Sequence, residues 1–258
     1  MDKGSRWTKG CDGARGWTGR PGPPGSHRHA MHISEIYKSV QGEGLLTGTQ
    51  SVFVRTSGCN LRCHYCDTPF ASWEPEGQAM EIHEIVAFCR EEEGRHVVLT
   101  GGEPMLQREI VELTRELSRA GMHITIETAG TLDRPVICDL MSISPKMSNS
   151  TPDRQRAGPW TARHEAARHR PDVIRRLTDH YPFQIKFVVD RPGDCQEIQA
   201  WLKQFPHLSR DRILLMPQGT QADELQERQA WLEEICQAEG FGFCPRMHIH
   251  WFGNRRGT

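Results

Sequence analysis

Apolar positions between residues 32 and 252 fall into two alternating patterns. Runs rich in β-branched and other apolar residues predict strands at 32–37, 51–56, 96–100, 123–128, 140–144, 183–189, 212–217 and 246–252. Apolar residues at helical spacing predict helices at about 81–93, 105–120, 170–180, 194–204 and 222–239. Because strands that alternate with helices indicate βαβ units and a parallel sheet, we expect an α/β fold.

Two segments depart from this pattern. Residues 1–30 are rich in Gly, Arg and Pro without a hydrophobic period, which predicts a disordered N-terminal tail before a core domain at 31–258. Met31 stands at the first strand and is a candidate for the true start. Residues 145–169 are polar, irregular and too long for a plain connection, so we expect a functional loop or an insertion. The arginines of 154–176 are more typical of a solvated face than of a partner site.

Charge and composition exclude several classes of protein. Residues 1–30 carry six Lys or Arg and two Asp or Glu, for +4, whereas the other 228 residues carry 26 and 31, for −5. A mildly acidic body is a poor surface for phosphate backbones, so we expect no nucleic-acid partner. No apolar run suits a transmembrane helix or the core of a secretory signal, so no membrane partner is expected. The nine cysteines are odd in number and crowd locally, which indicates a reducing cytoplasm rather than a disulfide framework.

Three cysteines lie within the stretch "GCNLRCHYCDTPF" at 58–70. Cys59, Cys63 and Cys66 offer three soft thiolates, one fewer than a tetrahedral zinc site needs. Two sites fit this set about equally: zinc with a distant fourth ligand or water, and a [4Fe–4S] cluster with one iron not held by protein. His64 is wedged between two of the cysteines, and we expect it to point away from the metal.

Three further motifs follow predicted strands. "LTGGEP" places two glycines and Glu103 after 96–100, where the glycines allow close backbone approach and the carboxylate favours a cation. Taken alone, this motif is better explained as a strand-to-helix turn with proline at its start. "TIETAG" at 125–130 and "SISPK" at 142–146 sit where an open α/β barrel presents ligand-binding residues. Lys146 is suited to pair with a ligand carboxylate, although an exposed lysine is the plainer explanation without that context.

The Cys-x3-Cys-x2-Cys spacing, with Tyr65 before the last cysteine, resembles the signature of the radical S-adenosylmethionine (SAM) enzymes. In that superfamily, SAM chelates the open iron through its amino and carboxylate groups. The cluster supplies one electron, and a 5′-deoxyadenosyl radical then abstracts a hydrogen. The resemblance implies a [4Fe–4S] cluster, SAM, a partial (β/α)6 TIM-like barrel, and contact between the "GGEP" turn and the methionine ammonium of SAM.

A closer resemblance runs from about residue 33 to residue 258. The order of "KSVQGEG", "FVRTSGCNLRCHYCDTPF", "LTGGEP", "SPK", "QIKFVV" and "PRMHIHWFGNRRGT" is similar to that of the 7-carboxy-7-deazaguanine synthase family. This implies a carbon–nitrogen lyase of queuosine and 7-deazapurine biosynthesis. Such an enzyme converts 6-carboxy-5,6,7,8-tetrahydropterin to 7-carboxy-7-deazaguanine with release of ammonia. The resemblance also implies Mg²⁺, a homodimer, and an electron donor such as flavodoxin or ferredoxin.

The same resemblance implies roles for residues of this chain. The metal ligands are Cys59, Cys63 and Cys66 for the cluster and Thr68 for Mg²⁺. The residues that meet SAM are Tyr65, Cys66, Asp67, Gly102, Glu103, Ser144, Pro145 and Lys146. The residues that meet the substrate are Val40, Gln41, Gly42, Glu43, Arg55 and Thr100. The guanidinium of Arg55 suits the substrate carboxylate, but an outward strand residue is an equally good explanation from the sequence alone. No side chain is assigned as a catalytic acid or base, because the radical comes from the cofactor.

Three alternatives remain open at this point. A glycyl-radical-enzyme activase shares the cysteine triad but acts on a protein, and the "QGEG" turn and Thr68 argue against it. A zinc-binding interaction module would hold one zinc per chain, and an electron-transfer protein would need a fourth cysteine ligand. At the C-terminus, His248, Trp251 and Gly253 either close the pocket or belong to a last strand.

Overall fold

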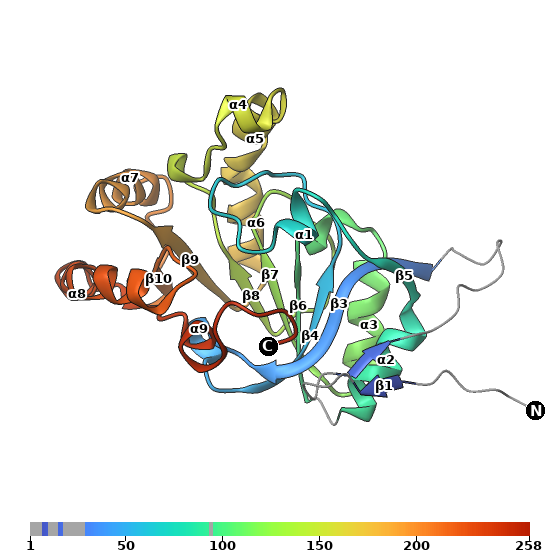
Figure 1. Ribbon diagram of the computed structural model, residues 1–258. Coiled ribbons are helices and arrows are strands. Elements are labelled where there is room, and N and C mark those ends of the chain that lie inside the picture. Colours follow the sequence, from blue (N-terminus) through green and yellow to red (C-terminus); the bar gives the residue numbers. More distant parts are fainter. Residues whose placement is uncertain (1–6, 10–14, 18–28, 93–94) are drawn as a thin grey trace, which may run out of the picture.

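The computed structural model describes residues 7–9, 15–17, 29–92 and 95–258 (Figure 1). Within them, one sheet contains β3 (Ala30–Val40), β4 (Gln50–Thr56), β5 (Gln78–Glu81), β6 (His96–Gly101), β7 (His123–Thr128), β8 (Leu140–Ile143), β9 (Phe183–Val189), β10 (Ile213–Pro217) and β11 (Gly242–Phe243). The sheet order is β11-β10-β9-β8-β7-β6-β4-β3-β5. β4 and β6 to β11 run parallel, whereas β3 is antiparallel to both neighbours. The parallel strands confirm the predicted α/β fold and its partial barrel.

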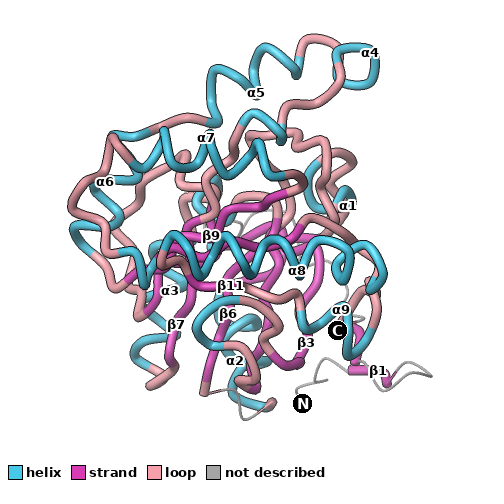
Figure 2. The backbone as a smooth tube through the Cα atoms, turned by 90° about the vertical axis from the view of Figure 1, so that its left-hand side faces the viewer, coloured by secondary structure: helices cyan, strands magenta, loops and turns pink. Residues whose placement is uncertain are grey.

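Helices cover the outer face of this sheet, as Figure 2 shows from the side. The longer ones are α2 (Ile82–Glu91), α3 (Ile110–Arg119), α6 (Pro171–His180), α7 (Pro192–Leu202) and α8 (Ala222–Glu239). In α3, Ile110, Leu113 and Leu117 recur every three or four residues and are fully buried. All five residues of β10 are buried, as expected for a parallel strand that is covered on both faces.

Shorter elements complete the described chain. They are α1 (Pro69–Ser72), α4 (Arg154–Ala157), α5 (Trp160–Arg168), α9 (Met247–Phe252) and 3-10 turns at Gly44–Leu46, Pro104–Leu106, Ser148–Ser150 and Arg210–Arg212. Residues 145–169, expected to be an irregular loop or an insertion, therefore contain two helices. The helix predicted at 105–120 begins later, because Pro104 opens a separate turn and Gln107 is extended.

The strand predicted at 246–252 is wrong, because Met247–Phe252 forms α9. Polar and apolar residues alternate in "RMHIHWF". Over so few residues, this alternation is compatible either with a strand or with about one and a half turns of helix. Of the six residues of α9, all of them described, only Ile249 is buried. The last position in the sheet belongs to β11 instead.

Before residue 29 the structure describes two short strands, β1 (Trp7–Lys9) and β2 (Arg15–Trp17), which pair antiparallel. The other residues of the predicted N-terminal tail lie outside the described part of the chain, so its disorder stays a prediction. Among the described helices, none combines the length and the apolar character that a membrane crossing requires.

The carboxyl ends of the parallel strands bring the motifs together. β4 leads into the cysteine loop, β6 into "GGEP", β7 into Ala129 and Gly130, and β8 into "SPK". Because β4, β6, β7 and β8 are parallel neighbours in this order, their four turns lie side by side at one edge of the sheet. A ligand site is therefore expected at this edge.

Candidate active site

A cavity of about 600 Å³ lies at this edge of the sheet. The residues proposed from the sequence that border it are Val40, Gln41, Gly42, Glu43, Arg55, Cys59, Cys63, Tyr65, Cys66, Asp67, Thr68, Thr100, Gly102, Ser144 and Lys146. Glu103 and Pro145 do not border it. The structure thus gathers residues that are up to 106 positions apart in the sequence, from Val40 to Lys146, around a single volume.

The loop between β4 and α1 brings Cys59, Cys63 and Cys66 to the cavity wall. Burial raises the pKa of the Cys59 and Cys63 thiols to about 12, so both are neutral until binding to a metal group displaces their protons. The Leu61 N–H donates to Cys59 Sγ at 3.4 Å, and the Ser72 hydroxyl lies 3.0 Å from Cys66 Sγ. Polar groups beside cluster sulfurs are one means by which a protein adjusts a cluster's reduction potential.

The donor set of this loop fits an iron–sulfur cluster. Cys59, Cys63 and Cys66 all border the cavity, and thiolates are the usual ligands of such clusters. Three soft thiols at the wall of a large cavity therefore suit a cluster that has one iron open to that cavity.

Residues of the 145–169 segment hold the cysteine loop from behind. His164 is fully buried, and its Nδ1 accepts a hydrogen bond from the Arg62 backbone N–H at 3.2 Å. Its Nε2 lies 3.0 Å from Ser150 Oγ, whose own proton goes to the Met147 carbonyl, so Nε2 is the donor. Burial lowers the pKa of His164 to about 4, which keeps the ring neutral and suited to both contacts. The Ser150 carbonyl also accepts from the His64 N–H at 2.8 Å.

The "GGEP" turn packs directly on the cysteine loop. A Cβ atom on Gly102 would lie 2.2 Å from the Gly58 carbonyl oxygen, so only glycine permits this approach. Glu103 is fully buried and accepts hydrogen bonds from Thr128 Oγ1 at 2.8 Å and from the Ala129 N–H at 2.9 Å. Its carboxylate therefore joins the turns after β6 and β7. The contact predicted between Glu103 and SAM stays a prediction.

Three other residues assigned to SAM, Ser144, Lys146 and Tyr65, also border the cavity. Lys146 Nζ donates to the carbonyl and the hydroxyl of Ser144, at 2.7 and 2.6 Å, which curls the "SPK" turn towards the cavity. Tyr65 is half-buried, and desolvation raises the pKa of its phenol, so it stays protonated. Pro145 holds the bend between Ser144 and Lys146 without bordering the cavity itself.

Arg55 points into the cavity from β4 and is fixed by two partners on β3. Its Nε donates to Glu35 at 2.7 Å, and its Nη2 donates to the Tyr37 hydroxyl at 3.0 Å. Burial works against the charge, but the neighbouring Tyr37 and Glu35 raise the pKa of the guanidinium. Among the described residues, none takes Arg55 Nη1, so this donor remains available to a ligand. The outward-facing alternative is therefore wrong.

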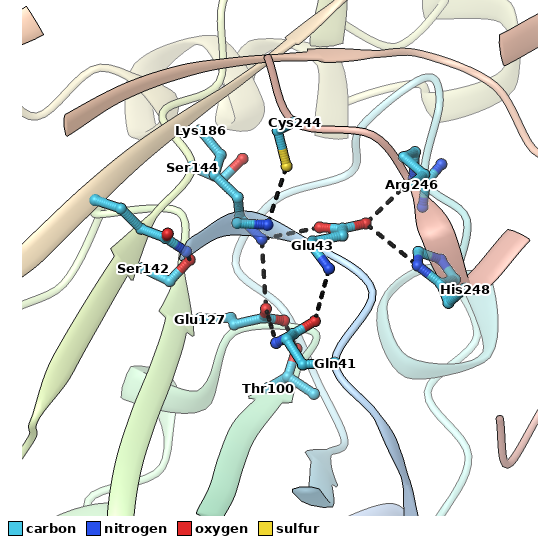
Figure 3. Close-up of polar contacts among 12 residues, drawn as sticks. Gln41, Glu43, Thr100, Glu127, Ser142, Ser144, Lys186, Cys244, Arg246 and His248 are labelled. Carbon is cyan, nitrogen blue, oxygen red and sulfur yellow. Dashed lines mark hydrogen bonds and ion pairs between the residues drawn. The ribbon is translucent and has the colours of Figure 1, made fainter. Parts of the chain in front are cut away.

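A buried ion network forms the floor of the cavity (Figure 3). Lys186 on β9 is 3% exposed, and its Nζ lies 2.8 Å from Glu43 and 3.3 Å from Glu127. Glu127 also accepts from Gln41 Nε2 at 3.3 Å and from Thr100 Oγ1 at 2.9 Å. Burial would raise the pKa of Glu43, but the charges of Lys186 and Arg246 lower it well below its usual value.

Arg246 and His248 extend this network from the C-terminal segment. Arg246 donates to Glu43 at 3.2 Å and also to Asp67, so it connects the floor of the cavity to the cysteine loop. Burial opposes the ionised form of Asp67, yet Arg246 lowers its pKa below the usual value. His248 lies against the 41–43 turn, where a Cβ on Gly42 would come within 2.5 Å of its backbone nitrogen. Of the three C-terminal residues expected either to close the pocket or to belong to a last strand, His248 borders the cavity, whereas Trp251 and Gly253 do not.

Lys186, Glu127 and Arg246 are the site residues that sequence reasoning missed. One signal was present for Lys186, because "QIKFVV" places a charge in the middle of an otherwise apolar strand. A lysine in a buried parallel strand requires an acidic partner, and this requirement marks it as a candidate site residue. Glu127, one residue before the end of β7 in "TIETAG", carries the same signal.

A trio of thiols beside the ligand edge of a partial barrel defines a radical SAM enzyme. The sequence profile of the Radical SAM superfamily matches residues 53–147, from β4 to just beyond "SPK". Among solved structures, the fold is similar to QueE from Escherichia coli, with a TM-score of 0.63, 24% identity, and coverage of 84% of this chain and 93% of that chain. It is also similar to Streptococcus suis SuiB bound to precursor peptide SuiA, with a TM-score of 0.54, 12% identity, and coverage of 78% and 54%.

Curated relatives define the family within that superfamily. The chain is 46% identical over 240 residues to 7-carboxy-7-deazaguanine synthase from Rhodopirellula baltica, covering 92% of this chain and 93% of the relative. It is 42% identical to the synthase from Halobacterium salinarum, covering 90% and 94%, and 34% identical to that from Pyrobaculum aerophilum, covering 88% and 97%. The chain therefore belongs to the 7-carboxy-7-deazaguanine synthase family. This confirms the resemblance drawn from the motifs and does not favour the activase or zinc-module alternatives.

Proposed function

We propose that this chain converts 6-carboxy-5,6,7,8-tetrahydropterin to 7-carboxy-7-deazaguanine and releases ammonia. The observation that carries the proposal is a cavity with thiols on one wall and the floor of Gln41, Thr100, Glu127 and Lys186 on another. When bound, the cluster and SAM supply a radical that takes a hydrogen from the pterin carbon bearing the carboxylate. Everything else in the reaction depends on how the chain's own residues hold the substrate.

Cofactor binding falls to the turns at the strand ends. We assign the cluster to Cys59, Cys63 and Cys66, and SAM to the turns that carry Tyr65, Asp67, Gly102, Ser144 and Lys146. Among the described residues, the Lys146 ammonium contacts only the uncharged oxygens of Ser144, so no carboxylate of the chain competes with that of SAM for it. Glu103 supports this site by holding two of the turns together.

We assign substrate binding to two parts of the cavity, a cationic side chain at one and hydrogen-bond acceptors at the other. We assign the pterin carboxylate to Arg55, which borders the cavity and whose guanidinium is held in place by Glu35 and Tyr37. The amino and ring N–H groups of the pterin match acceptors on Gln41 and Glu127. Lys186 favours the ionised form of Glu43, so the floor stays polar and charged when substrate excludes water from the cavity.

We assign Mg²⁺ to the hydroxyl of Thr68, which borders the cavity next to Cys66. A neutral hydroxyl is a weak ligand, so the ion relies on substrate oxygens and on water for its other positions, as Mg²⁺ commonly does. The proposal further includes a homodimer in the cytoplasm and an electron donor such as flavodoxin or ferredoxin. The test of the proposed reaction is its stoichiometry: one ammonia should be released per deazaguanine formed, and ammonia without that product would refute it.

A further inference from the structure

A basic surface lies on the outer side of the cysteine loop, away from the cavity. We call it the arginine face and define it as Arg154 and Arg156 of α4 and Arg163 of α5. All three side chains are exposed, and among the described residues none of them forms an ion pair. None of the three borders the cavity. The acidic side chains of the same segment are already engaged: Asp153 caps α4, and Glu165 pairs with Arg168.

Tryptophans connect the arginine face to the cysteine loop. The Arg156 guanidinium lies 4.2 Å from the ring centre of Trp73, and the Trp73 indole N–H donates to the carbonyl of Cys63 at 3.1 Å. The Arg163 guanidinium lies 5.3 Å from the ring centre of Trp160, which also carries Arg62 at 4.0 Å. A partner that reaches Arg156 is therefore separated from a proposed cluster ligand by a single indole side chain.

The segment that carries the arginines is fixed to the loop rather than loosely laid over it. The buried His164 of α5 and Ser150 hold the backbone of the loop at Arg62 and His64. In Figure 1, α4 and α5 project at the top of the molecule beside the loop that leads to α1. A partner bound to this projection would therefore meet the loop in one defined geometry.

The charge of the face selects the partner. Residues 31–258 carry a net charge of −5, whereas this face presents three exposed arginines without an acidic partner among the described residues, so it attracts acidic proteins. Substrate and SAM occupy the cavity side of the loop in the proposed function, which leaves the outer side for the entry of an electron.

We propose that the arginine face docks a small acidic protein that carries a one-electron donor, and that the electron reaches the cluster past Trp73. The inference rests on the proposed function, which needs a reduced cluster. In the transfer step the donor loses one electron and the cluster gains one, and no covalent bond is formed or broken. In this proposal the unpaired arginines form a partner site, whereas the sequence alone favoured a solvated face.

The test compares two charge reversals under two reductants. The R154E/R156E/R163E variant removes the face, and R90E/R95E/R115E reverses three exposed arginines on and beside α2 and α3, for which the described residues show no ion pair. Cluster-loaded proteins are mixed anaerobically with reduced flavodoxin or with dithionite, and cluster reduction is followed by stopped-flow absorbance and by electron paramagnetic resonance. The R154Q/R156Q/R163Q variant serves as a milder change if the reversal does not fold.

At low salt, reversal of the arginine face should slow reduction by flavodoxin about tenfold or more, and added salt should narrow the gap. Dithionite should reduce all the proteins at similar rates, and the control reversal should behave like the unmodified protein. Equal flavodoxin rates for the face variants and the unmodified protein would overturn the proposal, as would an equal loss in the control reversal. A normal cluster signal with dithionite but no deazaguanine product would instead count against the proposed function. The comparison of flavodoxin reduction rates would still test the docking proposal in that case.

Discussion

Replacing Lys186 with methionine should destabilise the protein, because its ammonium neutralises two carboxylates that are only 14% and 22% exposed. Glu43 lies 2.8 Å and Glu127 3.3 Å from Lys186 Nζ, and the lysine side chain is 4% exposed. Methionine fills a similar volume and removes only the charge. Removing one partner of a buried ion pair costs about 3–5 kcal/mol. Since Arg246 still compensates Glu43, we expect the lower end, about 3 kcal/mol of unfolding free energy.

The sign of the pH dependence follows from the carboxylate. In the folded protein the pKa of Glu43 is held below its unfolded value, so the pair contributes stability above the unfolded pKa, about 4.3, and loses it as the pH falls through the folded pKa. Without Lys186, one of the cations that lower this pKa is gone, so the carboxyl takes a proton at a higher pH than in the unmodified protein. The deficit of the variant should therefore be largest at pH 7 and should not grow as the pH falls to 5.

The assay is anaerobic urea unfolding at pH 7 and pH 5, followed by circular dichroism, with Lys203→Met as the matched control. Lys203 is exposed at the end of α7 and should tolerate the change. A loss of less than about 1 kcal/mol for Lys186→Met, the range of an exposed pair, would refute the reasoning, as would a deficit that grows on acidification.

Three further changes probe the other parts of the site. Arg55→Lys keeps the positive charge but loses the planar guanidinium that Glu35 holds in place. The KM for the pterin should therefore rise about 10–100-fold, which corresponds to the loss of one charged hydrogen bond, with a smaller change in kcat. An unchanged KM would contradict the assignment. Thr68→Ala should raise the Mg²⁺ concentration needed for half-maximal rate without loss of iron, whereas Thr68→Ser should not. His164→Ala leaves the buried Arg62 N–H without its partner, so a chelator should strip the cluster several-fold faster than from His169→Ala, an exposed control; equal rates would exclude the positioning role.

Much of the fold could be predicted because its signals are local. Parallel strands that are buried on both faces appear in the sequence as apolar runs, such as the one within "RILLMP" that forms β10. Helices that cover the sheet show apolar residues at helical spacing, which is how α3 was predicted. The segment at 246–252 defeated this reasoning, because its alternation fits two structures over so few residues. Only the long-range contacts of Arg246 with Glu43 and Asp67 decide between them.

The candidate site divides in the same way. The cysteine loop, "GGEP" and "SPK" are contiguous motifs whose residues are neighbours in sequence, so motif spacing was enough to propose them. Lys186 and Glu127 meet across β7 and β9, two strands that are separated by β8 in the sheet. Such a pairing depends on how the whole barrel closes, and no local pattern encodes it, although a lone charge in a buried strand marks each partner.

The most direct measurement is product identification. The protein is reconstituted with iron and sulfide, reduced, and incubated anaerobically with SAM, Mg²⁺ and 6-carboxy-5,6,7,8-tetrahydropterin, beside a Cys63→Ala variant treated identically. The account predicts 7-carboxy-7-deazaguanine by mass spectrometry from the unmodified protein and none from the variant. Cluster-loaded, reduced protein that forms no deazaguanine, or a Cys63→Ala variant that forms it at the same rate, would contradict the account.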